Sequence, residues 1–396
     1  MSETPVVWTS RLTTPGAGAF AALFGLEALG RALVVVVLPV QTLELMGSDE
    51  GVSILFLAGA VAAIAMAFVV PRLVAWIGRA RVVTLGILMI AGAAGLFTFQ
   101  LLPSQVLAFV LRACGVAILY AGLSLFVMDH IRRRELGRSE PLRMLSVGLG
   151  WTVGPVAGIQ IEALWGPGAP FVASALTAAV LLGYFWALRF RDLPIVRANP
   201  DRRVAPPLAH LGQFIAQPRL LLALLQGTGR GMFWASFTIY TPLYAVATGL
   251  GAQVGGLLVS IGNGFMLLMP LWGWTARRYG IRRVSLVAFP LAGLAMTAAG
   301  LLSAWPWVGA VAAVSAAGAM SIADGYGNAL FFRACKPSQR VAMTPIFSAQ
   351  RDLASIGHAG IFAVLLSVFP IQVVYITLGL VMFGLTWLAT RINKRL

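Results

Sequence analysis

Twelve long apolar segments, separated by short polar stretches, dominate this sequence of 396 residues. Only 11% of the residues are charged, whereas a soluble globular domain carries about 25%. A helix needs about 20 apolar residues to cross the hydrocarbon core of a bilayer. The pattern therefore predicts an all-α polytopic membrane protein with twelve transmembrane helices. It excludes a soluble enzyme, a disordered chain and a disulfide scaffold.

The apolar segments fall into two groups of six. The first group runs at about 17–43, 51–74, 82–102, 104–130, 141–163 and 170–189, and the second at about 218–247, 252–275, 284–303, 306–332, 341–368 and 371–391. A polar stretch with four prolines separates the groups. We therefore expect an N-terminal six-helix bundle over residues 1–189, a cytoplasmic linker over 190–217 and a C-terminal six-helix bundle over 218–396.

Basic residues are distributed very unevenly over this map. All but four of the 29 Lys and Arg residues lie in the termini and in alternate connecting segments, and the six intervening loops contain none. Cytoplasmic loops of membrane proteins collect Lys and Arg. We therefore expect both termini and the linker to face the cytoplasm, in a cell inner (plasma) membrane. The net charge of +16 reflects these loops, and no nucleic-acid partner is expected.

The two groups of segments repeat each other in sequence. Gly30 and Arg31 in the first span match Gly229 and Arg230 in the seventh, and polar loops of similar sequence follow the second and eighth spans. Two parallel six-helix repeats around a site at the membrane midplane are typical of one large class of transporters.

These two loops resemble the signature loop of the major facilitator superfamily, G-x-x-x-D-R-x-G-R-R-R. The matching residues are Gly78, Arg79 and Arg81 in the first copy and Gly273, Arg278, Gly280, Arg282 and Arg283 in the second. Ala75 and Arg277 replace the acidic residue, which in the family helps to latch the state that is closed on the inside. The resemblance implies two six-helix pseudo-repeats and secondary transport of a small molecule, without a cofactor.

Two further segments resemble motifs of the same family. Arg112, followed by Gly115, resembles a fourth-span motif built on an intramembrane arginine. The fifth span resembles the G-x-x-x-G-P-x-x-G-G motif of the drug–proton antiporter branch, with Ile159 in place of the last glycine. The matching residues of the fifth span are Gly150, Gly154, Pro155 and Gly158. This second resemblance implies export of the substrate.

Charged residues inside the spans are the first candidates for a transport site. A charge at the centre of a membrane helix costs about 2.5–3.5 kcal/mol on translocon scales, so each needs a partner or a task. Glu27 and Arg31 lie four residues apart and share a helix face. We predict that Glu27 takes up a proton and that Arg31 binds the substrate; a static ion pair is the alternative. Arg112 is a candidate for the same site, or else an arginine held by backbone carbonyls.

The seventh and tenth spans carry further candidates. Gln226 and Arg230 lie one turn apart, and Tyr240 continues the same side of the seventh span at helical spacing. They form either the wall of a binding cavity or a packing stripe. Asp324 lies in a run of small residues in the tenth span. It is either a second proton site or the partner of an arginine in another span.

The eleventh span places Arg351 and His358 on one face. Both are candidates for substrate binding; a gate pair of Arg351 with Asp352 and a packing role for His358 are the alternatives. The three histidines and two cysteines of the chain form no catalytic or metal-ligand pattern. We therefore expect no enzyme, no metal site and no cofactor.

The charges within the spans do not balance. Four arginines (Arg31, Arg112, Arg230 and Arg351) face only three acids of comparable depth (Glu27, Asp324 and Asp352). Arginine stays protonated, and its planar fork fits carboxylate and phosphate groups. The surplus therefore favours an anionic substrate. In the competing account the fourth arginine binds backbone or a lipid head group, and the substrate is neutral or cationic.

Together these features predict a monomeric secondary active transporter. It would move a small amphipathic or anionic organic molecule across the inner membrane by alternating access, with proton-coupled efflux as the leading hypothesis. Proton-coupled uptake of an organic anion is one alternative. A non-transporting assembly or receptor protein is another, because a fold does not fix a function. The expected partners are the substrate, protons and the lipid bilayer.

The predicted orientation can be tested by cysteine labelling. In a chain whose two native cysteines are replaced by serine, single cysteines are introduced into residues 1–16, into the linker 190–217 and after the last span. An impermeant maleimide should label them in inverted vesicles and leave them unlabelled in intact cells. Labelling of these positions from outside intact cells would contradict the orientation.

Overall fold

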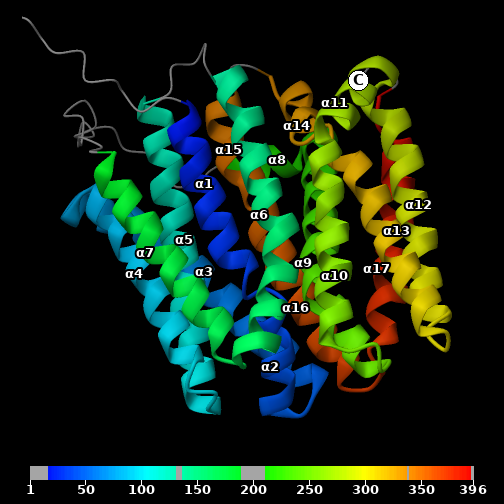
Figure 1. Cartoon of the computed structure of the whole chain (residues 1–396). Helices are drawn as coiled ribbons and strands as arrows, with labels where there is room; N and C mark the ends of the chain where they lie inside the picture. The colour runs from blue at the N-terminus through cyan, green and yellow to red at the C-terminus, as the bar shows by residue number, and fades with distance from the viewer. Residues whose placement is uncertain (1–16, 131–135, 189–209, 337–338, 394–396) are drawn as a thin grey trace, which may run out of the picture.

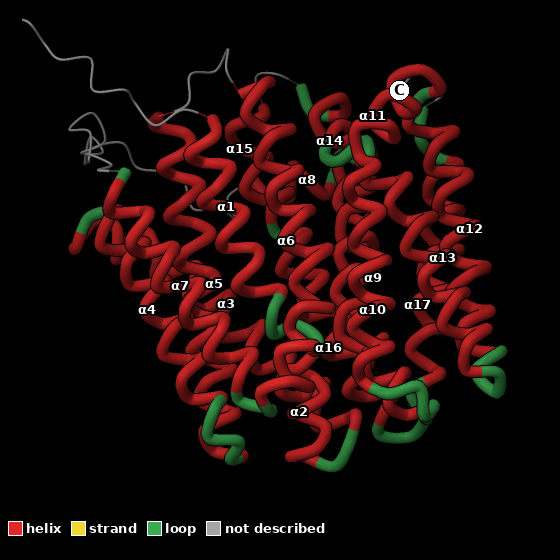
Figure 2. Tube along the Cα trace, in the orientation of Figure 1, coloured by secondary structure: helices red, strands yellow, loops and turns green. Residues whose placement is uncertain are grey.

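The structure, a computed structural model, describes residues 17–130, 136–188, 210–336 and 339–393 (Figure 1). Over these residues the secondary structure is helical, with no strand (Figure 2). The first group of spans comprises α1 (Ala17–Ala32), α2 (Val37–Met46), α3 (Asp49–Ile77), α4 (Arg79–Phe97), α5 (Leu102–His130), α6 (Leu136–Trp165) and α7 (Ala169–Ala187). The second group comprises α8 (Leu211–Ile215), α9 (Pro218–Ala247), α10 (Ala252–Gly264), η3 (Phe265–Leu268), α11 (Met269–Tyr279), α12 (Ile281–Leu301), α13 (Pro306–Asp324), α14 (Ala329–Ala334), α15 (Arg340–Ser348), α16 (Gln350–Leu366) and α17 (Gln372–Thr390).

Ten segments of the described chain are long and apolar enough to cross a membrane. The other two membrane-length segments are α9 and the α15–α16 pair. These two carry the polar side chains of Gln226, Arg230, Arg351 and Asp352. Twelve segments in two groups of six confirm the predicted fold class. Most of the predicted linker, 190–217, lies outside the described residues.

The same pairs of helices pack against each other in the two groups. α1 packs against α6, and its counterpart α9 packs against α16. α4 packs against α5 and α7, and its counterpart α12 packs against α13 and α17. The two groups of spans are therefore pseudo-repeats in space as well as in sequence.

The first predicted span is not one continuous helix. Turns at residues 33–36 separate α1 from α2, where the sequence has four consecutive valines, 34–37. β-Branched side chains are restricted at χ1 in a helix, which lowers their helix propensity. The predicted segment 17–43 is therefore interrupted close to Arg31.

Three spans of the second group are also interrupted. The eighth span passes through the short 3-10 helix η3 just before Pro270, because a proline ring clashes with the preceding helical turn. The tenth span is broken at residues 325–328, where two glycines occur and Gly327 has a φ of 48°. The eleventh span is broken at Ala349, between α15 and α16. Each break frees backbone groups that need partners inside the membrane.

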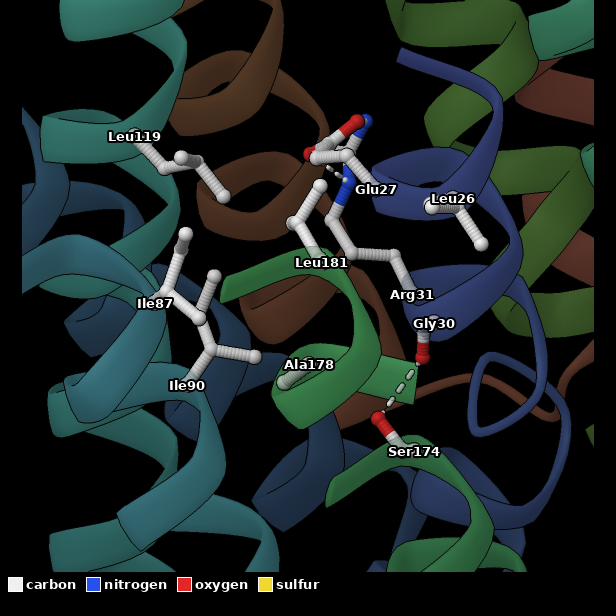
Figure 3. Close-up of a pocket in the computed structure, with 10 residues that line it drawn as sticks. All are labelled: Leu26, Glu27, Gly30, Arg31, Ile87, Ile90, Leu119, Ser174, Ala178 and Leu181. Atoms are coloured by element: carbon white, nitrogen blue, oxygen red, sulfur yellow. Dashed lines mark hydrogen bonds and ion pairs between the residues drawn. The ribbon is translucent and has the colours of Figure 1, made fainter. Parts of the chain in front are cut away.

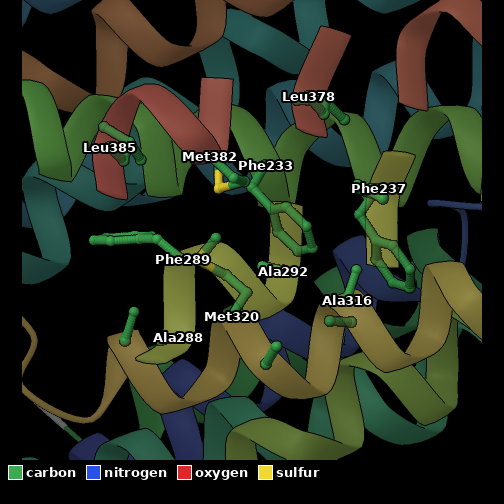
Figure 4. Close-up of a cluster of buried hydrophobic side chains, with 14 of the residues drawn as sticks. Phe233, Phe237, Ala288, Phe289, Ala292, Ala316, Met320, Leu378, Met382 and Leu385 are labelled. Atoms are coloured by element: carbon green, nitrogen blue, oxygen red, sulfur yellow. The ribbon is translucent and has the colours of Figure 1, made fainter. Parts of the chain in front are cut away.

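The core of the second group is built from aromatic and small side chains. Figure 4 shows Phe233 and Phe237 of α9 between side chains of α17 and side chains of α12 and α13. The rings of these two phenylalanines are stacked, with centroids 6.1 Å apart. Small residues on α12 and α13, such as Ala292 and Ala316, are fully buried. Since lipid is as apolar as leucine, close packing of this kind, rather than escape from water, holds membrane helices together.

The two groups meet near one edge of the bundle, here called the arginine-poor edge. It is formed by the loops 47–48, 98–101, 166–168, 248–251, 302–305 and 367–371 and lies at the bottom of Figure 1. α3 packs against α16, α6 against α10 and α2 against α9. Ser53 and Tyr240 share a hydrogen bond of 2.7 Å across this junction, and the backbone N–H of Val156 donates to Ser260 Oγ at 2.9 Å.

The fifth and first spans approach each other closely along a stripe of glycines. A Cβ atom at Gly154 would overlap Ala32, and one at Gly158 would overlap the carbonyl oxygen of Leu33. A Cβ at Gly150 would lie 2.9 Å from the backbone nitrogen of Leu29. The motif glycines of the fifth span therefore allow α6 to lie against α1 and the turn that follows it.

Replacing Gly158 should destabilise this contact. In Gly158→Ala the added methyl group has no room, and overpacking of a tight core costs about 1–3 kcal/mol. We expect a lower midpoint of thermal unfolding in detergent, measured by tryptophan fluorescence. Gly183→Ala in α7 is the control, because nothing lies within 4 Å of its Cβ position. Equal midpoints for the two variants would show that the stripe is not tightly packed.

Candidate transport site

An ion pair lies within α1, in the middle of the first span. Arg31 Nε is 2.6 Å from Glu27 Oε1, and Arg31 Nη2 donates to Glu27 Oε2 at 3.3 Å. The Glu27 side chain is 6% exposed and that of Arg31 is 25% exposed. The spacing of four residues thus brings the two groups together as a forked pair, with only the arginine open to its surroundings.

A small cavity adjoins the ion pair (Figure 3). Beside the pair its walls are mostly apolar, including Ile87, Leu119 and Leu181. It leaves about 10 Å³ for the centre of a water molecule, which is the room for about one water. The Glu27 carboxylate therefore depends mainly on Arg31 for the stability of its negative charge.

Arg112 of α5 lies next to this pair. Its Nη2 donates to the backbone carbonyl of Arg31 at 3.4 Å, and both Glu27 and Arg31 are close enough to interact with its charge. The three residues together carry a net charge of +1 while Glu27 is ionised. Arg112 thus lies beside the ion pair and also makes the backbone contact that was considered as its alternative.

A tryptophan that the sequence analysis did not single out completes this part of the site. The guanidinium of Arg31 lies 5.5 Å from the centre of the Trp151 ring, within the range of a cation–π interaction. Trp151 belongs to α6 and follows Gly150 of the glycine stripe. Its position inside the fifth-span motif could have identified Trp151 as a candidate from the sequence. Its contact with Arg31, however, depends on the packing of α6 on α1.

Arg230 of α9 binds to backbone and side-chain groups at the break in the tenth span. Its Nη1 donates to the carbonyl of Ala323 at 3.1 Å and lies 3.4 Å from Asp324 Oδ1, and its Nη2 donates to the carbonyl of Gly327 at 3.0 Å. The guanidinium also lies 5.2 Å from the Tyr326 ring centre. A cation at the C-terminal end of α13 satisfies carbonyls that the break leaves free.

Neighbouring polar groups extend this arrangement. The indole N–H of Trp234 donates to the carboxylate of Asp324. The Tyr326 hydroxyl donates to Gln226 Oε1 at 3.3 Å and accepts a hydrogen bond from Ser285. Arg230, Asp324 and Gln226 therefore lie together, and Asp324 is paired with an arginine of another span, as one of its two alternatives predicted. Their hydrogen bonds go mainly to the chain itself.

Tyr240 lies elsewhere, at the junction near the arginine-poor edge. It is 1% exposed, and its hydroxyl shares the hydrogen bond with Ser53. Tyr375 Oη donates to its backbone carbonyl at 3.1 Å. Phe233 and Phe237, which precede Tyr240 on α9, are buried in the core of the second group. These three aromatic side chains of α9 therefore pack against protein.

Arg351 of α16 reaches across to the other group of spans. Its Nη2 donates to the Tyr120 hydroxyl at 2.9 Å, and its guanidinium lies 4.3 Å from the Tyr120 ring centre. Both side chains are exposed, and so is Asp352. His358, two turns along α16, is 4% exposed, and its Nδ1 lies 2.9 Å from the carbonyl oxygen of Ala354. The two residues predicted to share a face therefore have different surroundings.

The signature loops have the same backbone conformation in both repeats. Gly78 joins α3 to α4 with a φ of 83°, and Gly280 joins α11 to α12 with a φ of 87°. These left-handed angles favour glycine. The arginines of the motif follow directly: Arg79 and Arg81 on α4, and Arg282 and Arg283 on α12.

The second copy of the loop contains further contacts. Arg278 lies over Trp274 at 5.8 Å and over Tyr279 at 5.9 Å. A Cβ at Gly273 would lie 3.2 Å from the carbonyl oxygen of Gly325, so the eighth and tenth spans are close here. Ala75 and Arg277, at the positions of the acidic residue, are both exposed.

The contacts of Arg230 predict a structural role that Arg351 lacks. Arg230→Gln leaves Asp324 without its cation and frees the carbonyls at the break, and breaking a buried ion pair costs about 3–5 kcal/mol. The midpoint of thermal unfolding in detergent should fall clearly. Arg351→Gln, which removes an exposed side chain, is the control and should change it little. If both variants unfold at the same temperature, the contacts of Arg230 do not stabilise the interrupted tenth span.

Comparisons with known proteins agree with this architecture. The family model of the Major Facilitator Superfamily matches residues 20–357. The nucleoside transporter NupG has a similar structure, with a TM-score of 0.70 and 13% sequence identity over 94% of this chain and 98% of that chain.

Peptide transporters are similar to the same degree. A POT transporter in complex with sulfate has a TM-score of 0.74 and 14% identity, covering 96% of this chain and 95% of that one. A POT family transporter in complex with 5-aminolevulinic acid has a TM-score of 0.71 and 13% identity, covering 96% of each chain. At these identities the likeness shows the fold, and the family model shows the family. The chain belongs to the major facilitator superfamily, whose members are membrane transporters.

Proposed function

We propose that this protein is a proton-coupled secondary transporter that carries a small amphipathic organic anion through the inner membrane by alternating access. The observation that carries the proposal is the Glu27–Arg31 ion pair. It lies in the middle of a membrane span, and its arginine is a quarter exposed while its carboxylate is buried. Arg112 gives the group a net positive charge, which favours an anionic ligand.

The ion pair couples a proton to the anion. An anion that takes Arg31 away from Glu27 leaves a carboxylate against apolar walls such as Ile87 and Leu181. An isolated buried charge is so costly that such groups are neutralised instead, so Glu27 takes up a proton. By linkage, each of the two ligands strengthens the binding of the other. The static ion pair considered as the alternative would show no such linkage.

This sign of coupling bears on the direction of transport. When proton and anion bind together, an inward proton gradient drives uptake, so we place proton-coupled anion uptake first. Export in exchange for protons requires a substrate that competes with the proton for Glu27, which suits a cationic or neutral amphipathic molecule. The Gly154–Pro155 segment, which packs between the first and eighth spans, belongs to the motif that resembles the drug–proton antiporter branch. Because of this resemblance, proton-coupled efflux is the second candidate.

The conformation fits one state of an alternating-access cycle. The two pseudo-repeats, which we take as the domains 1–189 and 218–396, are joined near the arginine-poor edge by Ser53, Tyr240, Val156 and Ser260. By the distribution of basic residues this edge faces the outside. We assign Tyr240 to the outer closure, and Arg31 and Arg351 to the path that leads to the cytoplasm.

Proton movement in proteoliposomes tests the function. Purified protein is reconstituted with a trapped pH dye and exposed to aliphatic and aromatic carboxylates, dicarboxylates and lipophilic cations. Protein-free liposomes are subtracted, because protonated monocarboxylic acids cross bilayers unaided. Anion-dependent proton entry supports uptake, and cation-dependent proton release supports efflux. If no ligand moves protons, the protein is not a proton-coupled transporter of these classes, and a non-transporting role is favoured.

Glu27→Gln should separate binding from coupling. The amide cannot exchange a proton but leaves Arg31 available, so we expect ligand binding and exchange to persist while gradient-driven accumulation is lost. Glu44→Gln, an exposed acid at the end of α2, is the control and should accumulate substrate as the unchanged protein does. Full gradient-driven accumulation by Glu27→Gln would remove this residue from the mechanism.

A further inference from the structure

Two arginines from different halves of the protein each lie on an aromatic ring. Arg31 of α1 lies over Trp151, and Arg351 of α16 lies over Tyr120. The Arg31 side chain is 25% exposed, and Arg351 is exposed. Arg112, in contrast, donates to a backbone carbonyl, and Arg230 is held by two carbonyls and a carboxylate (above). Arg31 and Arg351 are therefore the two intramembrane arginines best placed to meet a ligand.

The two arginines approach the same stretch of α5. Leu119 forms part of the wall of the cavity beside Glu27 and Arg31, as Figure 3 shows. The hydroxyl of the next residue, Tyr120, accepts a hydrogen bond from Arg351. Successive helical residues differ by about 1.5 Å along the axis and by about 100° around it. The cavity beside Arg31 and the phenol that binds Arg351 therefore adjoin the same turn of α5.

Arg351 is bound by a weak, neutral partner. In the described part of the chain it forms no ion pair, and its hydrogen bond goes to the phenol of Tyr120. Hydrogen bonds between a guanidinium and a carboxylate or phosphate are roughly twice as strong as neutral ones and are often bidentate. An anionic group would thus replace the phenol readily, while the Tyr120 ring still supports the guanidinium from its face.

We propose that the substrate carries two anionic groups, one bound by Arg31 and the other by Arg351. In the absence of substrate, the Tyr120 hydroxyl accepts the hydrogen bond of Arg351 instead. This inference rests on the proposed function and names the substrate class: a dicarboxylate, or a carboxylate that also bears a phosphate or sulfonate. Since each arginine belongs to a different half, such a ligand links the halves. A ligand stabilises the conformation to which it binds best, so the dianion favours closure of the halves around it.

Binding of matched ligands tests the inference. The probes are succinate, glutarate and adipate, each paired with its monoamide, which has the same length and one charge less. Affinities are measured by titration calorimetry on the full-length protein in detergent. The unchanged protein should bind one of the dianions more tightly than its monoamide. In Arg351→Gln the ratio of the two affinities should fall by about tenfold to hundredfold, as expected for a lost hydrogen bond to a charged group.

Three further variants distinguish recognition from general effects. Arg31→Gln should weaken dianion and monoamide alike, because the first anionic group loses its partner. Tyr120→Phe, which keeps the ring and removes the competing hydroxyl, should leave the dianion affinity equal or increase it. Arg391→Gln removes a comparable exposed arginine, 4.6 Å from the Trp387 ring and at the end of α17. It is the control and should not change the ratio.

The outcomes separate this inference from the proposed function. If monoanions move protons in proteoliposomes but dianions bind no better than their monoamides, the two-anion inference is wrong and the proposed function stands. If Arg351→Gln weakens both ligands equally, Arg351 acts as a gate or in folding, and the inference is also wrong. If no anion moves protons, both fail.

Discussion

A charged side chain inside a bilayer needs a partner within the protein, and this constraint explains the contacts of the four arginines within the spans. Arg31 finds an acid one turn away on its own helix. Arg230 finds an acid and two carbonyls on α13 and in the turn that follows it. Arg112 takes a carbonyl of the first span, and Arg351 takes a phenol from the opposite half. Of these partners, only the Tyr120 phenol is both neutral and exposed. A ligand could therefore replace the partner of Arg351 more easily than the partners of the other three arginines.

The breaks in the spans and the arginines depend on one another. A helix interrupted within the membrane leaves carbonyls that no water can satisfy. At the break in the tenth span, Arg230 donates to the carbonyls of Ala323 and Gly327. Near the turns that interrupt the first span, Arg112 donates to the carbonyl of Arg31. The arginines thus allow irregular backbone at this depth, and the irregular backbone gives the arginines their acceptors.

The two halves are similar in architecture and different in chemistry. The first half holds a titratable acid against apolar walls, beside an arginine that is a quarter exposed. In the second half the matching arginine is fixed to the chain, and a different arginine, on α16, is exposed and reaches toward the first half. In the proposed mechanism this asymmetry divides the roles between the halves: one half couples a proton, and the other half responds to the ligand.

The sequence by itself determined the features that depend on local spacing or on composition. Runs of apolar residues located the spans, the repeated loops revealed the two pseudo-repeats, and a spacing of four residues placed Glu27 beside Arg31. The tertiary structure alone decided which distant residues meet. Asp324 is 94 residues from Arg230, and Tyr120 is 231 residues from Arg351. Helical periodicity also put Tyr240 on the side of Arg230, but in the folded protein its hydroxyl meets Ser53 of α3. Periodicity fixes the face of a helix on which a side chain lies, whereas the partner opposite that face is fixed only when the helices pack.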